Sequence, residues 1–178
     1  MISSSLRTAR HETDTILAQL STLADLAKEE PSLELRAPAV SAWSIAEQLE
    51  HLRRSDVTIV DALTSLDVDG PREGSPTFAG RLVLVTRYIP RGVGRAPGAT
   101  QPLEVDLDSL ARGLIDVRQG FDTLAAELER LARSRATIRH PALGHFTATQ
   151  MLTFTAIHHH HHRKIIDDIR RANEKATR

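Results

Sequence analysis

The sequence predicts an all-α protein in which four long helices form a bundle, with a long irregular insertion between the second and third long helices. Four stretches repeat apolar residues at helical spacing, and residues that favour helix starts precede them. Glycine and proline concentrate in residues 67–106, so this insertion is expected to be loop-rich with one short helix. A chain of 178 residues is expected to form a single domain, spanning residues 1–178, with a substantial core.

The first long helix is expected to begin at one of three serines, residues 3–5, and to run to about Lys28. Serine is a favourable N-cap residue because its hydroxyl accepts a hydrogen bond from a first-turn amide. Pro31 and Pro38 then interrupt the chain and predict a linker. The residues that keep helical spacing in this helix are Leu6, Ala9, Ile16, Leu20, Leu23 and Ala27.

The second long helix is predicted directly after Trp43, because Ser44 and Glu47 have the spacing of a capping box. Its apolar stripe runs from Ile45 to Leu63. His51 lies more than about 90° from the centre of that stripe, which by itself favours a surface histidine. In a bundle, however, a residue on the flank of a helix can face a cleft between two neighbouring helices.

The insertion at residues 67–106 contains one apolar segment, Phe78 to Tyr88, whose composition is ambiguous between strand and helix. We predict a short helix that packs across the bundle. Between Glu73 and Glu104 the only charged residues are four arginines, which could hold an anionic substrate or a cofactor carboxylate, although solvated arginines on a loop are the commoner case. These residues are Arg81, Arg87, Arg91 and Arg95.

The third long helix is expected from about Ser109 to Leu131, with Asp106 or Asp108 as its cap. Its apolar residues alternate steps of four and three, and glycines within it permit a close approach of helices. Residues 138–146 are predicted to form a turn that leads into the last helix. Within this turn, His140 and His145 are interpreted as structural residues, because they lack helical registration with the other histidines.

The last long helix is predicted from Thr147, which has capping-box spacing with Gln150, to Ile169. It contains five consecutive histidines, residues 158–162. A purification tag is a poor interpretation, because the run lies in the middle of a helix pattern and sixteen residues follow it.

Two histidines of this run are expected to face inward. At 100° per residue, His158 and His162 lie about 40° apart on the apolar side of the helix, whereas His159 lies about 100° from His158. Two imidazoles one helical turn apart can bind one metal ion. The alternative is a pair of core histidines that are hydrogen-bonded to neighbouring helices, and a third ligand from elsewhere in the chain would decide between the two.

The composition excludes several classes of function. The 23 basic and 23 acidic residues balance, so no long-range field attracts nucleic acid or an anionic membrane, and 3% aromatic residues argue against base stacking. The absence of cysteine excludes disulfides, thiolate metal sites and cysteine nucleophiles. Without a membrane-spanning apolar run or a signal-peptide core, a soluble cytoplasmic protein is expected.

Three motifs follow one another in the chain. Trp43-Ser-Ile-Ala-Glu-Gln-Leu-Glu-His51-Leu is followed about ninety residues later by His140-Pro-Ala-Leu-Gly-His-Phe-Thr-Ala-Thr-Gln-Met-Leu, and then by His158-x-x-x-His162-Arg-Lys-Ile-Ile. In this order they resemble the DinB superfamily of metal-binding four-helix bundles, over nearly the whole chain. The resemblance implies an up-down-down-up bundle in which His51, His158 and His162 are the metal ligands.

Two features depart from the family pattern. The family often has glutamine a few residues after its last ligand, where this chain has Ile165 or Ile166. The insertion at residues 67–106 is also longer than in short members. Both departures concern the substrate pocket more than the metal ligands.

The resemblance also implies a chemistry. Three neutral imidazoles leave at least one coordination position open on zinc, nickel or iron(II), as in a catalytic site. Related proteins are S-transferases or isomerases that use low-molecular-weight thiols, and others look like hydrolases, so a small-molecule substrate is expected. The carboxylates of a thiol would bind Arg91 or Arg95, while Glu47 and Glu50 could orient a ligand or accept a proton.

Two other interpretations of the same sequence stay open. In the first, the bundle binds a metal or a small ligand without turnover. In the second, the protein is a homodimeric scaffold in which the histidines have no function. A metal analysis separates the scaffold from the other two, and a screen of thiols and electrophiles separates an enzyme from a binding protein.

Overall fold

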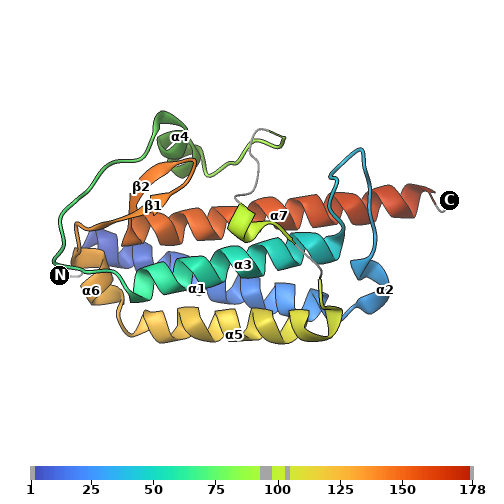
Figure 1. Cartoon of the computed structure of the whole chain (residues 1–178), viewed down its shortest axis with the longest axis horizontal. Helices are drawn as coiled ribbons and strands as arrows, with labels where there is room; N and C mark the ends of the chain where they lie inside the picture. Colours follow the sequence, from blue (N-terminus) through green and yellow to red (C-terminus); the bar gives the residue numbers. More distant parts are fainter. Residues whose placement is uncertain (1–2, 93–97, 103–104, 177–178) are drawn as a thin grey trace.

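Four long helices pack side by side in the computed structural model, which describes residues 3–92, 98–102 and 105–176 (Figure 1). The prediction of an all-α bundle is confirmed. The four long helices are α1 (Ser4–Leu26), α3 (Ile45–Thr64), α5 (Leu107–Ala125) and α7 (Ala148–Ala176). The shorter elements are α2 (Glu30–Leu33), α4 (Phe78–Thr86), the 3-10 helix η1 (Gly98–Thr100), α6 (Leu128–Arg133), β1 (Thr137–His140) and β2 (Gly144–Thr147).

The helix directions place α7 parallel to α1 and antiparallel to α3 (Figure 1). The Ser5 and Thr149 hydroxyls are hydrogen-bonded at 3.0 Å near the starts of α1 and α7. Near the other end of the bundle, Arg170 of α7 donates to Glu29, which follows α1. Helix α7 therefore has α1 on one side and α3 on another, and it contacts both.

The predicted helix starts are confirmed by their hydrogen bonds. Each of the four long helices has a side chain that satisfies first-turn amides, which lack partners inside the helix. Two of the starts are complete capping boxes, in which the third helical residue also accepts from the cap backbone. The cap residues are Ser3, Ser44 with Glu47, Asp106, and Thr147 with Gln150.

The core is one cluster of buried apolar side chains from all four long helices, including Ile16, Leu52, Phe121 and Ile169. Apolar burial of this extent is the main stabilising contribution to a bundle. In the described part of the chain, no helix combines the length and the apolar character that crossing a membrane requires.

The predicted third helix is wrong at its C-terminal end, because the chain breaks between α5 and α6 instead of continuing to Leu131. The Ala126 and Glu127 amides donate to carbonyls three residues earlier, which tightens the chain and ends the α-helix. Leu128 and Leu131 are still buried, so the apolar spacing continues across the break. The apolar spacing therefore predicted one continuous helix and gave no indication that the chain forms two helices, α5 and α6.

Residues 138–146, which were predicted to form a turn, belong to a β-hairpin, and only residues 141–143 form its turn. Strands β1 and β2 pair in antiparallel register from Thr137 opposite Thr147 to His140 opposite Gly144. Gly144 has a φ of 86°, a conformation that favours glycine. The hairpin connects α6 to α7, lies at the start of α7, and is hydrogen-bonded to Ser75 and Thr77 of the insertion (Figure 1).

The short helix predicted in the insertion is confirmed as α4, which Thr77 caps by accepting from the Gly80 amide. Helix α4 is anchored to the hairpin, because the Thr77 amide donates to the Leu143 carbonyl at 2.8 Å. Its outer face is exposed, with Phe78 and Val85 more than 80% accessible. After α4, Arg91 forms an ion pair with Asp168 of α7, and η1 lies beside α3 (Figure 1).

Candidate metal centre

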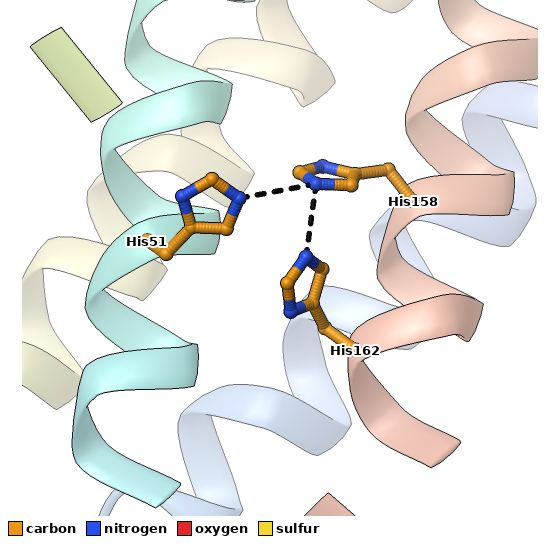
Figure 2. Close-up of side chains that lie close together, drawn as sticks. All are labelled: His51, His158 and His162. Atoms are coloured by element: carbon orange, nitrogen blue, oxygen red, sulfur yellow. Dashed lines mark hydrogen bonds between the residues drawn. The ribbon is translucent and has the colours of Figure 1, made fainter. Parts of the chain in front are cut away.

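Three histidines from two helices meet inside the bundle, where they form the three-histidine cluster, His51, His158 and His162. His51 extends from α3, and the other two extend from successive turns of α7 (Figure 2). The Nε2 atom of His158 lies 3.2 Å from Nε2 of His51 and 3.1 Å from Nε2 of His162. Their side chains are 5%, 9% and 7% exposed, respectively. The structure therefore brings together all three residues that the family resemblance singled out.

The second ring nitrogen of two of these histidines is held by an oxygen acceptor. His51 Nδ1 lies 2.7 Å from the Thr100 carbonyl oxygen, and His162 Nδ1 lies 2.6 Å from Gln48 Oε1. The Gln48 amide is oriented by its nitrogen, which donates to Ser41 Oγ at 2.9 Å. Since a carbonyl oxygen only accepts, both Nδ1 atoms donate, and each neutral ring presents a lone pair at Nε2. A lone pair is what a metal ion requires.

Hydrogen bonding alone does not satisfy this arrangement. The lone pairs of His51 and His162 both face Nε2 of His158, which carries at most one hydrogen. One of the two short nitrogen contacts is therefore left without a proton, and among the described residues His158 Nδ1 has no hydrogen-bonding partner. The alternative of a fully satisfied core pair does not fit. A cation shared by the three Nε2 atoms removes the conflict.

The spacing of the nitrogens also suits a metal. Ligand nitrogens about 2.0–2.1 Å from a tetrahedral zinc ion lie about 3.3–3.4 Å apart. Two of the pairs in the three-histidine cluster are at 3.1 and 3.2 Å, and all the candidate ligand atoms lie within 4.8 Å of one another. The residues present fit a divalent metal ion.

Burial keeps these imidazoles neutral. Burial has the largest effect on His51 and lowers its pKa. The Thr100 carbonyl and the charge of Asp56 raise that pKa, but by less. Burial also lowers the pKa values of His158 and His162 well below the usual value, and repulsion between neighbouring histidines lowers them further. Neutral imidazole is the form that binds metal, so the environment favours ligation at neutral pH.

Aromatic rings flank the cluster. The Phe154 ring stacks on His158 with an interplanar angle of 15° and a centroid distance of 5.4 Å. The Trp43 ring lies 5.1 Å from that of His51. Such contacts restrict the rotation of the ligand rings and exclude water from their sides.

The two arginines predicted to bind a substrate, Arg91 and Arg95, are not both seen at the three-histidine cluster in the described part of the chain. Arg91 forms an ion pair with Asp168 of α7 at 2.6 Å and is partly exposed. Arg95 lies outside the described residues. Arg87, from the same group of arginines, forms two hydrogen bonds with the buried carboxylate of Glu12. The role of Arg91 and Arg95 in binding a substrate therefore stays a prediction.

The two acidic candidates near His51 make contacts elsewhere. Glu47 completes the capping box of α3 and pairs with Arg36, as its competing role as a cap predicted. Glu50 is buried and forms two hydrogen bonds of 2.7 Å with Arg53, which packs against Gly113 of α5. The groups that hold the rings are instead Gln48 and the Thr100 carbonyl. Of these two groups, only Gln48 could have been found from the sequence, because it lies one helical turn before His51 and therefore on a similar face of the helix.

His158 and His162 face inward as expected, but His159, which the helical count placed about 100° away, is buried as well. Its Nε2 atom lies 2.7 Å from Oδ2 of Asp56, and this side chain is 1% exposed. Helix α7 contacts both α1 and α3, so its buried arc is wider than a single stripe. His140, interpreted as structural, accepts from the Ala142 and Leu143 amides in the hairpin turn.

The fold is a four-helix bundle, and three imidazoles meet at one point inside it, where they could hold a metal ion. This combination is typical of proteins that bind a metal ion within a helical core. The family model described as the DinB superfamily matches residues 5–166, a range that includes the whole three-histidine cluster. The chain belongs to the DinB superfamily. No curated protein and no solved structure matched the chain.

Proposed function

We propose that this protein binds a divalent metal ion through Nε2 of His51, His158 and His162 and acts as a metal-dependent enzyme on a small molecule. The observation that supports the proposal is the unsatisfied convergence of three neutral imidazoles, two of which are fixed by acceptors at Nδ1. A divalent metal with an open position polarises a substrate oxygen or lowers the pKa of a bound water or thiol.

The residues of the chain would prepare such a site before any ligand arrives. The Thr100 carbonyl and the Gln48 side chain fix which nitrogen of His51 and His162 is free to bind. Phe154 and Trp43 restrict the rings from the side. Three protein ligands leave at least one coordination position for a substrate, which is the arrangement of catalytic zinc sites.

The class of reaction follows from the family resemblance. Transfer of a low-molecular-weight thiol and metal-dependent hydrolysis both use an open coordination position, and the imidazole ligands suit zinc, nickel or iron(II). In the thiol reaction, Arg91 would exchange Asp168 for a carboxylate of the thiol, and Arg95 would assist it. Binding without turnover, or a dimeric scaffold, is the alternative function.

Metal content is the first test, and His51 is the decisive residue. Protein made without a tag and purified without a metal column is loaded with zinc, and its affinity is measured by competition with a chromophoric chelator. His51→Ala removes a ligand that lies outside the histidine run, so the tight site is expected to be lost. The matched control is His160→Ala, which removes an exposed histidine of the run.

The two variants distinguish the proposed site from adventitious binding by five adjacent histidines. If the run alone captured the metal, His51→Ala would bind as the unsubstituted protein does, and His160→Ala would weaken binding. That result would contradict the proposal. Tight binding that depends on His51 and is independent of His160 supports it.

Turnover is tested separately with the metal-loaded protein. A panel of low-molecular-weight thiols with activated electrophiles, and a panel of activated esters and amides, are assayed for product. Activity that is lost in both the metal-free protein and His51→Ala supports an enzyme. Metal binding without turnover of any of these substrates supports the binding function. Light scattering measures whether the protein is a homodimer, which stays a prediction.

A further inference from the structure

Beside the three-histidine cluster lies a second polar contact that the proposed ligands do not include. His159 of α7 and Asp56 of α3 are joined by a 2.7 Å hydrogen bond, and their side chains are 1% and 0% exposed. A carboxylate is buried in this way only at a cost in stability, which a hydrocarbon side chain of similar size would avoid. The pair therefore requires an explanation beyond packing.

The pair joins the two helices that supply the ligands. His159 follows His158 directly in α7, and Asp56 lies five residues after His51 in α3. Because successive residues of a helix point about 100° apart, an anchor at His159 fixes the direction in which His158 points. The anchor thereby sets the rotation of α7 relative to α3.

The ligand geometry is sensitive to this rotation. Side-chain ends lie about 5–6 Å from a helix axis, so a turn of about 20° moves a ring nitrogen by about 2 Å. Metal–ligand distances tolerate deviations of only about 0.2 Å. A contact that prevents such a turn of α7 would keep His158 and His162 within reach of His51.

The charge of Asp56 also reaches the cluster. The Asp56 carboxylate lies 2.7 Å from the ring of His159, which follows the ligand His158 directly, so a buried acidic group lies next to the cluster. Three neutral imidazoles do not offset the charge of a divalent cation, and a buried anion nearby favours its binding. Among the described residues, Asp56 Oδ1 has no hydrogen-bonding partner, and His159 supplies the hydrogen bond to the other oxygen.

We propose that Asp56 and His159 form a positioning pair for the metal site, which holds α7 in the rotation that ligation requires and places a buried negative charge beside the cation. The proposal rests on the proposed function, in which His51, His158 and His162 bind the metal. Neither member of the pair is a ligand itself.

Cobalt(II) is the probe, because its visible absorption bands report the coordination geometry as well as the affinity. His159→Leu removes the donor to Asp56, and His159→Gln keeps a nitrogen donor near the position of Nε2. Asp56→Asn keeps an acceptor of the same shape and removes the charge. We expect His159→Leu to bind cobalt about 10–100-fold more weakly with shifted bands, Asp56→Asn about tenfold more weakly, and His159→Gln close to the unsubstituted protein.

The matched control is Glu12→Gln, which neutralises another buried carboxylate, the partner of Arg87. This variant loses stability without touching the contact between α3 and α7, so its cobalt affinity and bands should be unchanged. Folding of each variant is checked by circular dichroism and urea unfolding. If His159→Leu does not fold, the isosteric Asp56→Asn decides alone.

Two failures are distinguishable. If the unsubstituted protein binds no cobalt, or if His51→Ala binds it equally well, the proposed function itself is wrong. If cobalt binding depends on His51 but folded His159→Leu and Asp56→Asn retain the original affinity and bands, the positioning pair is overturned, and Asp56 and His159 contribute only to stability.

Discussion

Gln48 shows how a single side chain determines what a histidine can bind. Its Oε1 atom accepts from His162 Nδ1 at 2.6 Å, so His162 directs its lone pair towards His158. Gln48 is 1% exposed, and its amide nitrogen is engaged by Ser41 at 2.9 Å, which holds the amide in this orientation. The ring of His162 is therefore oriented before a metal binds.

Removal of this acceptor should weaken metal binding. Gln48→Leu fills a similar space without accepting a hydrogen bond, so His162 loses both its orientation and its defined tautomer. We expect zinc affinity to fall by about 10–100-fold, as for other residues that hold a ligand histidine. Chelator competition at neutral pH measures the change. Ser41→Ala, which removes the other partner of Gln48, serves as the control and should cost less than Gln48→Leu.

At the residue scale, the sequence predicted only part of the site. His158 and His162 were recognisable from their spacing in an amphipathic helix, and His51 from the family resemblance. The partner of His51 was not recognisable, because it is a main-chain carbonyl that every amino acid possesses. His159 was missed because helical periodicity predicts a direction but not the number of neighbouring helices that a direction meets.

Helix α4 shows how an element can depend on the absence of a side chain. A Cβ atom on Gly80 would lie 2.4 Å from the Leu143 carbonyl oxygen in the hairpin, and the neighbouring Thr77 amide donates to the same oxygen at 2.8 Å. The backbone of α4 therefore packs directly on the hairpin turn. The composition of residues 78–88 was ambiguous between strand and helix, and nothing in it indicated this contact.

Substitution at this contact should detach α4 from the hairpin. Gly80→Ala would gain helix propensity but forces the carbonyl of Leu143 away, and we expect a net loss of at least about 1 kcal/mol, since main-chain atoms cannot move aside cheaply. Urea unfolding measures the loss, and hydrogen exchange should accelerate in residues 78–86.

The control is Gly98→Ala, where an added Cβ atom meets no heavy atom within 4 Å. This variant should be neutral or more stable, by up to about 1 kcal/mol, because alanine reduces the conformational freedom of the unfolded chain. Equal stability of the Gly80 and Gly98 variants would show that the hairpin contact contributes nothing.

Elements whose signals are local were the easiest to predict. The capping boxes at Ser44 and Thr147 involve residues three apart, and both helix starts are correct. The hairpin at residues 137–147 depends on pairing and on docking against α4, so its short strands have little local signature. The break after Ala125 has neither glycine nor proline to reveal it.

At the scale of the whole molecule, buried histidines link folding to pH. Burial lowers the pKa of several histidines in the folded state, in the case of His161 to about 4, with the charge of Arg91 as a further cause. The others are His51, His140, His158 and His162. In the unfolded chain a histidine has a pKa of about 6.5, so below that pH the unfolded state binds more protons than the folded state.

The metal-free protein should therefore lose stability on acidification. As the pH falls through about 6.5 towards the lowered folded values, each of these histidines contributes a loss of up to about 1.4 kcal/mol per pH unit. Urea unfolding at several pH values between neutral and mildly acidic measures the slope. His161→Gln removes one titrating group and should flatten it, whereas a stability that does not change with pH would contradict the prediction.

The carbonyl that holds His51 imposes an unusual kind of constraint on the protein. Any amino acid at position 100 offers the same oxygen, so the identity of that residue matters little to the ring it orients. The orientation of the His51 ring depends instead on the length of chain that brings position 100 next to α3. Among natural variants, position 100 is therefore expected to vary among residues of similar size, while the stretch between α4 and α5 resists insertions and deletions. A one-residue deletion there would cost the protein more than several substitutions.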